Sequence, residues 1–312
     1  MIEIRRYKEN DEQSWSAFLD TAKNATFLFE RRYMDYHKQR FHDHSLMFFL
    51  DGKLIALLPA NADGETFFSH TGLTYGGLIM SNDCHAEDVL EIFVSLKKYL
   101  AEHHFKQVVY KAIPAIYHRV PAEEDLYALF RVCNARLISR DISSTIIEER
   151  PVKWRRDRRY GANKAHTNGI TVERDEDYAD FWQILQDNLS NKYGANPVHS
   201  LDEMLLLKSR FPDNILLYTA RLEGEMLGGT VLYAASQVLH AQYISASARG
   251  KHLHAIDAIF SYVLNNVACD YKYFDFGKST EDNGNFLNSS LIYQKEGFGG
   301  RAICYDTYLF DV

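Results

Sequence analysis

The sequence predicts an α/β protein made of two similar domains in tandem, and three observations support this fold class. Apolar residues alternate in short runs in some segments, as in strands, and recur at three- and four-residue spacing in others, as in helices. Asp51-Gly52 and Glu223-Gly224 each separate two apolar runs, which indicates hairpins. The order hairpin, strand, helix, strand, helix, strand occurs once in each half of the 312 residues. We therefore expect domains at 1–150 and 151–312, each a mixed sheet flanked by helices.

In the first half, the clearest element is a helix from about Ala86 to His104. Acidic residues stand at its start and Lys97 and Lys98 near its end, as the helix dipole favours. The other elements expected in this half are strands at 2–7, 46–50, 54–60, 108–113 and 137–147, a helix around Trp15, and a helix at 122–132.

In the second half, the clearest element is a helix from Leu253 to Val267 with one apolar face. Ser200, followed by Glu203 three positions later, is typical of a helix N-cap. The other elements expected here are helices at 178–189 and 288–296 and strands at 215–220, 226–233, 238–244, 271–276 and 302–310.

Composition limits the class of protein. Hydrophobic residues make up 46% and charged residues 25%, which is typical of a folded globular protein. The net charge of −7 argues against DNA as a partner. The four cysteines are scattered without a CxxC pair, so we expect no metal site and a reducing, cytoplasmic location. No apolar run is long enough for a membrane span.

The stretch around the expected strand that ends at Asp275 is the first candidate ligand site. A polar loop, 278–285, follows the strand and precedes a helix, and an α/β sheet often holds its ligand at such a place. Gly297-Phe298-Gly299-Gly300 follows Lys295-Glu296. These glycines either end the helix in a tight turn or bring backbone close to a substrate and present Lys295 to it.

A basic segment between the two halves is the second candidate site. Lys153, Arg155, Arg156, Arg158, Arg159 and Lys164 are accompanied by a single acid, Asp157. On a helix, Arg155, Arg158 and Arg159 would share a face. This face is either solvated, as most charge runs are, or a clamp for a phosphate or carboxylate.

Several stretches in the second half resemble the FemAB-like branch of the GNAT acyltransferase superfamily. They are DFGKST, LNSSLIYQKEGFGG, GANKAHTNGITVERDEDYADFWQIL, NPVHSLDEM, FPDNILLYTARLEGEMLGGTVLY and AQYISASARGKHLHAIDAIF, which together cover Trp154 to Tyr308 in the family order. The resemblance implies two tandem GNAT-like domains and N-acyltransferase activity on an amine of a small molecule or cell-envelope precursor. It implies no tightly bound cofactor, because the acyl donor is a substrate.

The donor that the resemblance implies is acyl-CoA or an aminoacyl-tRNA. GNAT enzymes cradle the CoA pyrophosphate on a glycine-rich loop. Here that loop corresponds to Arg249, Gly250 and Lys251, but His252 and His254 stand where glycines are usual. A Cβ obstructs close backbone approach, so CoA binding by this loop is weakened. The chain lacks the heptad run expected of a tRNA-binding arm, so the acyl-CoA or acyl-carrier donor is favoured over tRNA.

The resemblance also implies roles for particular residues. Lys295 and Asp275 would be catalytic. The residues expected to bind substrate are Arg155, Arg158, Arg159, His199, Lys278, Ser279, Asn288 and Phe298. Two alternatives remain open: a tRNA-dependent peptidoglycan aminoacyltransferase, and a non-catalytic protein that binds an anionic ligand in the same groove.

Overall fold

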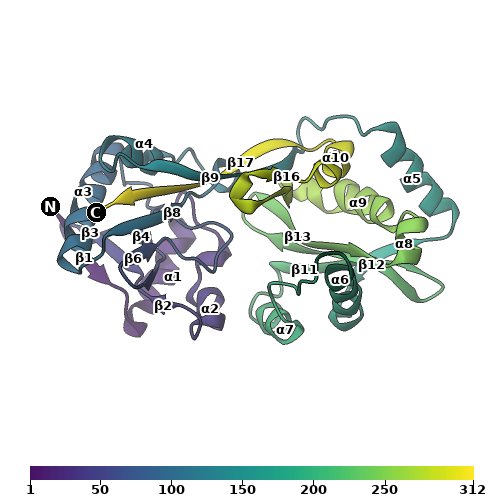
Figure 1. Cartoon of the computed structure of the whole chain (residues 1–312), viewed down its shortest axis with the longest axis horizontal. Helices are drawn as coiled ribbons and strands as arrows, with labels where there is room; N and C mark the ends of the chain where they lie inside the picture. Colours follow the sequence, from purple (N-terminus) through teal and green to yellow (C-terminus); the bar gives the residue numbers. More distant parts are fainter. The chain divides into compact units, whose positions relative to one another are not determined.

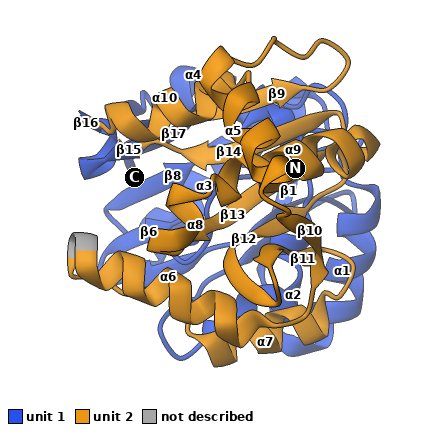
Figure 2. Ribbon diagram, turned by 90° about the vertical axis from the view of Figure 1, so that its right-hand side faces the viewer, with its two compact units in different colours: residues 1–142, 280–286, 304–312 blue, residues 143–279, 287–303 orange. Residues whose placement is uncertain are grey.

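The computed structural model describes residues 1–191 and 194–312, and it divides the chain into two compact units. The first unit contains residues 1–142, 280–286 and 304–312, and the second contains residues 143–279 and 287–303 (Figure 2). Both units combine sheets with flanking helices (Figure 1), so the predicted α/β class is confirmed.

The division differs from the expected boundary at residue 150 because the last strand of each half of the chain extends into the other unit. Strand β9 (Arg136–Ile147) ends in the second unit, where Thr145 pairs with Asp275 of β14 (Tyr273–Lys278). Strand β17 (Arg301–Asp311) ends in the first unit, where it pairs with β8 (Gln107–Lys111). Strand membership follows hydrogen-bonded pairing, which the order of elements along the chain does not specify.

The first unit contains two sheets. One has the antiparallel order β1-β3-β4-β7, and the other joins β2, β5, β6 and β8 to the end of β17. The elements of this unit not yet given are β1 (Ile2–Arg6), α1 (Glu12–Thr21), α2 (Arg31–Met34), β2 (His42–Asp43), β3 (Leu46–Leu50), β4 (Lys53–Leu58), β5 (Asn61–Asp63), β6 (Thr66–Phe68), β7 (Ile79–Met80), α3 (Ala86–Glu102), α4 (Glu124–Arg131) and β15 (Thr280–Glu281); β16 (Phe286–Leu287) begins there.

The predicted hairpin at Asp51-Gly52 is present between β3 and β4. Both residues have positive φ, 49° and 79°, which is the geometry of the tight turns that favour Asp-Gly. Helix α3 buries Val89, Ile92 and Phe93, so the predicted amphipathic helix is confirmed.

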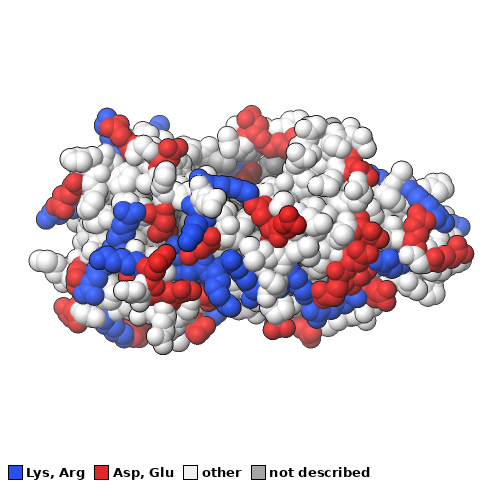
Figure 3. Space-filling view, turned by 90° about the horizontal axis from the view of Figure 1, so that it is seen from below, with Lys and Arg blue, Asp and Glu red and all other residues white. Residues whose placement is uncertain are grey.

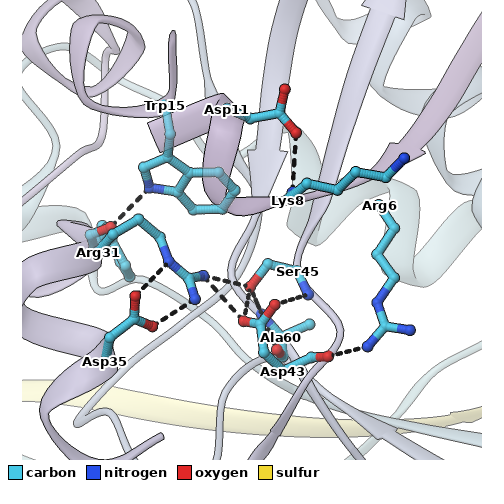
Figure 4. A network of polar contacts seen from close by, with 10 residues as sticks. Arg6, Lys8, Asp11, Trp15, Arg31, Asp35, Asp43, Ser45 and Ala60 are labelled. Carbon is cyan, nitrogen blue, oxygen red and sulfur yellow. Dashed lines mark hydrogen bonds and ion pairs between the residues drawn. The ribbon is translucent and has the colours of Figure 1, made fainter. Parts of the chain in front are cut away.

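A buried cation holds the start of the first unit together (Figure 4). The guanidinium of Arg31 in α2 lies 3.0 Å from Asp43 and 2.5 Å from Asp35. The hydroxyl of Ser45 donates to Asp43 at 2.7 Å, and the ring of Tyr7 lies 4.1 Å from the guanidinium carbon. Because each charge has a partner, the network fixes α2 against the strand ends without leaving a charge unpaired.

The second unit contains one sheet in the order β10-β11-β12-β13-β14-β9. All its neighbours are antiparallel except β13 and β14. The remaining elements are α5 (Arg156–Thr167), β10 (Thr171–Asp175), α6 (Tyr178–Tyr193), α7 (Leu201–Arg210), β11 (Ile215–Leu222), β12 (Glu225–Ala234), β13 (Val238–Ala246), α8 (Ala248–His252), α9 (Ala255–Asn266) and α10 (Ser289–Gly297).

Helices cover both faces of this sheet, with α9 and α10 on one face and α6 and α7 on the other (Figure 1). Helix α9 buries Ile259, Phe260, Val263 and Leu264, as its apolar stripe predicts. The predicted cap of α7 is also present, since the Ser200 hydroxyl accepts from the amide of Glu203. Among the described residues, no helix is long and apolar enough to cross a membrane.

Strands β13 and β14 are paired over only part of their length. Their pairing runs from Val238–Tyr273 to His240–Asp275 and stops there, whereas β13 continues to Ala246. A register shift between β12 and β13 leaves Gln242 opposite no residue of β12. The sheet is therefore forked just beyond His240 and Asp275.

Candidate active site

A cavity of about 600 Å³ lies in the second unit, at the fork between β13 and β14. Most of its wall is apolar, and the polar groups are few. The apolar lining residues are Leu185, Leu189, Ile244, Ala246, Ile256, Phe260, Phe276, Leu291 and Phe298; the polar ones are Asn188, Asn191, Ser245, Lys251, Gln294 and Lys295. A concave, apolar site with a few convergent polar groups is typical of a small-molecule pocket.

Lys295 is the buried cation of this cavity, since only 4% of it is exposed. Its ammonium donates to the carbonyls of Gly277 and Lys278 at 2.8 and 2.7 Å. Burial lowers the pKa of Lys295 to about 8, although the nearby Asp275 acts in the opposite direction. The residue is thus a cation at neutral pH beside the end of β14, where the sequence placed it.

Asp275 is fully buried and has three hydrogen-bond donors. Its carboxylate accepts from Ser143 at 2.5 Å, from Thr145 at 2.9 Å and from Nδ1 of His240 at 2.8 Å. The donors come from β9 and β13, on either side of β14. Asp275 therefore holds neighbouring side chains in place and is itself shielded from a substrate.

His240 is the residue at this site that sequence reasoning missed. It stands in the otherwise apolar run 238–241 of β13, opposite Asp275 at the last pair before the fork. A lone polar residue inside a strand pattern was the available signal, but the pattern alone does not show what faces it. Only the pairing of β13 with β14 brings the imidazole to the carboxylate.

The basic segment lies along α5, and its arginines differ in their surroundings. Arg158 lies 2.9 Å from the buried carboxylate of Asp257 in α9. Arg155 contacts Asp157 at 3.3 Å and stacks on Tyr293, with 3.3 Å from guanidinium carbon to ring centre. Arg159 is exposed. The anion clamp stays a prediction, and Arg159 is its most accessible member.

The loop that corresponds to the GNAT phosphate loop forms the short helix α8. Lys251 lines the cavity and its ammonium contacts the side-chain oxygen of Asn188, while Arg249 pairs with Glu225. His254 has a φ of +64°, a conformation that glycine adopts at lower energy. Its ring contacts Asp257 at 3.1 Å. The backbone thus keeps a glycine-like bend, while side chains occupy its surroundings.

Gly250 is needed for packing. A Cβ at this position would lie 2.0 Å from the carbonyl oxygen of Leu227 in β12. We expect Gly250→Ala to lower the free energy of unfolding by about 1–3 kcal/mol, since backbone must move to admit the methyl group. Urea unfolding of the variant and of Gly224→Ala measures this. Gly224 has open space around it but a positive φ of 86°, so a smaller, purely conformational loss is expected there. Equal losses would contradict the packing role.

The remaining candidates lie at the margins of the cavity or away from it. Phe298 is buried and lines the cavity. The side chain of Asn288 caps α10 by accepting from the backbone amide of Leu291. The backbone amide of Asn288 donates to the carbonyl of Ser279, a buried residue. The backbone carbonyl of Lys278 accepts a hydrogen bond from the ammonium of Lys295. His199 is buried next to α7, 2.6 Å from the hydroxyl of Tyr243. The structure thus brings Phe298 and Lys251 to the cavity with Lys295.

Two further observations concern surface charge and possible metal ligands. On the face of the molecule in Figure 3, basic and acidic side chains are interspersed. Within the part of the chain that the structure describes, no group of three or more His, Cys, Asp or Glu side chains could hold a metal ion.

Residues 152–284 match the family model described as an acetyltransferase (GNAT) domain. This range includes most of the elements that form the fork. A comparison with curated proteins gave no match.

Solved structures with similar folds cover nearly the whole chain. A crystal structure of FemX has a TM-score of 0.69 at 11% identity and covers 99% of this chain and 97% of its own. The C-terminal domain of a putative lysylphosphatidylglycerol synthetase from Agrobacterium fabrum has a TM-score of 0.61 at 13% identity, with 96% and 91% covered. A tandem GNAT protein from the clavulanic acid biosynthesis pathway has a TM-score of 0.53 at 8% identity, with 100% and 98% covered. At these identities the likeness concerns the fold.

Proposed function

We propose that the chain is an acyltransferase of the FemAB-like branch of the GNAT superfamily, which the GNAT family match over residues 152–284 supports, and that it forms an amide by moving an acyl group from a thioester donor to an amine. The acceptor is an amine of a small molecule or cell-envelope precursor, and the reaction takes place in the cytoplasm. The observation that carries the proposal is the forked, mostly apolar cavity with the buried ammonium of Lys295 in its wall.

The fork suits a chain-like donor. Beyond His240, β13 has no pairing with β14, so the edge of residues 241–246 that faces away from β12 is open to amide groups of a ligand. A thioester donor with an amide-bearing arm would extend along this edge. When the amine attacks the carbonyl carbon of the donor, negative charge develops on the carbonyl oxygen. A cation already held near that oxygen stabilises the transition state.

The apolar wall favours a donor whose acyl group is longer than acetyl. Phe260, Phe276 and Phe298 supply ring surface, and Leu185, Leu189 and Leu291 supply aliphatic surface. Each methylene moved from water into such a wall contributes about 0.8 kcal/mol. The weakened phosphate loop then matters less, because the acyl chain supplies binding free energy that the pyrophosphate contacts do not.

The test is a series of acyl-CoA donors with two to eight acyl carbons, titrated calorimetrically. We expect the Kd to fall about fourfold for each added methylene, which is 0.8 kcal/mol expressed as a ratio. Leu291→Trp narrows the cavity and should abolish this gain. Ile292→Trp is the matched control, because Ile292 is also half-buried on α10 but does not line the cavity.

Three results would count against the proposal. A Kd that does not depend on acyl-chain length would contradict the preference for an acyl group longer than acetyl. If the protein binds aminoacyl-tRNA and none of the acyl-CoAs, the donor is an ester and the proposed thioester donor is wrong. Tight binding of the donors without acyl transfer to any amine would favour a non-catalytic binding protein.

A further inference from the structure

The imidazole of His240 has two nitrogen atoms in different situations. Nδ1 lies 2.8 Å from Asp275. Since the carboxylate of Asp275 also accepts from the hydroxyls of Ser143 and Thr145, it is an acceptor toward His240, and Nδ1 carries the proton. This fixes the tautomer of the neutral ring, in which Nε2 has the free lone pair.

Nε2 has no hydrogen-bond partner among the described residues of the protein. It is also not among the buried side-chain nitrogens that lack a partner, so Nε2 is open to solvent or to a ligand. The side chain of His240 is only 11% exposed, and Nε2 is the ring nitrogen that a ligand can reach.

The position of the ring agrees with a chemical role. His240 and Asp275 form the last pair before β13 and β14 separate, and the next residue of β14, Phe276, lines the cavity. Gly277 follows with a φ of +78°, and a Cβ there would lie 3.3 Å from Cε1 of His240. The glycine leaves room beside the imidazole at the closed end of the fork.

We propose that His240 is the proton acceptor of the acyl transfer and that Asp275 is its positioning residue. This rests on the proposed function. The amine nitrogen bonds to the carbonyl carbon of the thioester, and Nε2 takes the proton that the nitrogen loses. The carbon–sulfur bond then breaks, and the leaving thiolate receives that proton from His240 and departs as the thiol. An amide and a thiol result from an amine and a thioester, and His240 is restored.

The variant His240→Asn tests the role without removing the contact with Asp275. The asparagine amide can donate to the carboxylate as Nδ1 does, but it has no group in the place of Nε2. With octanoyl-CoA and a panel of primary amines, we expect kcat to fall 10²- to 10⁴-fold, while the Kd for octanoyl-CoA stays within twofold. Added imidazole should restore part of the lost rate, which a merely structural histidine would not allow.

Asp275→Asn and the double variant measure the positioning role. Groups that act as a unit are not additive, so the double variant should be little slower than His240→Asn alone. Multiplied losses would assign Asp275 a role separate from His240. If Asp275→Asn fails to fold, Thr145→Val replaces it, since this change removes one donor to Asp275 and keeps the shape of the side chain.

Chemical modification gives a readout that does not depend on the amine. Diethyl pyrocarbonate attacks an imidazole nitrogen that has a free lone pair. We expect His240 to be modified in the wild-type protein and protected by octanoyl-CoA, while the exposed His103 of the first unit is modified equally with and without donor. An unreactive His240 would overturn the assignment.

The outcomes separate this inference from the function on which it rests. Acyl transfer by the wild-type protein with an undiminished rate in His240→Asn would overturn the inference alone. Protection of His240 by octanoyl-CoA without transfer to any amine would overturn the proposed function and, with it, the role of His240.

Discussion

Lys295→Met should lower kcat by 10²- to 10³-fold. Methionine keeps the length and apolar stem of the side chain and removes only the ammonium, which we propose stabilises negative charge on the carbonyl oxygen in the transition state. A loss of this size is typical when one such donor is removed. Steady-state kinetics with octanoyl-CoA and the amine panel measures it. Lys251→Met is the matched control, since Lys251 lines the same cavity; we expect it to raise the Kd of the donor with little change in kcat.

Stability should change little in Lys295→Met at neutral pH, because two effects offset each other. The carbonyls of Gly277 and Lys278 lose their donor, at about 1–3 kcal/mol for each group left unsatisfied. The folded protein no longer buries an ammonium, whose pKa is lowered from 10.5 to about 8; this difference corresponds to about 3 kcal/mol. A large loss of stability in proportion to the loss of activity would make Lys295 structural.

The pH dependence identifies the active form of Lys295. If the cation acts as we propose, kcat should fall as pH rises through about 8. A neutral amine acting as a base would give the opposite trend. In unfolding, the sign also follows from the lowered pKa: between about 8 and 10.5 the unfolded chain binds more protons at this group, so the wild-type protein gains stability with rising pH relative to Lys295→Met. Urea unfolding of both proteins across this window checks it.

Arg158→Ala should lower the free energy of unfolding by about 3 kcal/mol. The guanidinium lies 2.9 Å from the carboxylate of Asp257, whose side chain is only 5% exposed. Removing the guanidinium takes away the formal charge that offsets the buried carboxylate, which keeps only its contact with the imidazole of His254 among the contacts described above. Helices α5 and α9 approach each other closely here, since a Cβ at Gly161 would lie 2.3 Å from Asp257. Urea unfolding at pH 7 measures the loss.

Two variants and one change of pH sharpen this prediction. Asp257→Asn combined with Arg158→Ala should recover much of the loss, since no charge stays buried. Burial already raises the pKa of Asp257, with Arg158 opposing the effect. Without Arg158 this folded-state pKa rises further above the unfolded value, so the variant loses stability as pH rises through that interval. The loss relative to wild type should therefore be smaller at pH 5 than at pH 7. An equal loss at both would contradict the buried pair.

Arg159→Ala is the matched control for stability and the cleaner test of an anion clamp. Its side chain is exposed, so we expect a change in unfolding free energy within about 0.5 kcal/mol. If the clamp exists, this variant weakens donor binding, and the effect shrinks as salt rises. Unchanged affinity at low salt would leave a solvated helix face.

The features that sequence alone determined are those set by neighbours along the chain. Asp51-Gly52 predicted a turn because its backbone needs positive φ at both residues, and Ser200 with Glu203 predicted a cap because the two are three residues apart. The apolar stripes of α3 and α9 predicted which faces are buried. The position of Lys295 near the end of α10 followed from the family resemblance and the glycines after it.

Tertiary structure decided what depends on residues far apart in sequence. His240 and Asp275 are separated by 35 positions, and Thr145 and Asp275 by 130; they meet because β13, β14 and β9 are neighbours in one sheet. The exchange of last strands that brings β9 there leaves no trace in the order of elements. The sequence placed Arg158 either in an anion clamp or on a solvated helix face, and the carboxylate that pairs with it lies about a hundred residues later. Local patterns set turns, caps and faces through short-range sterics and hydrogen bonds, whereas strand pairing selects which buried charges and imidazoles lie in contact.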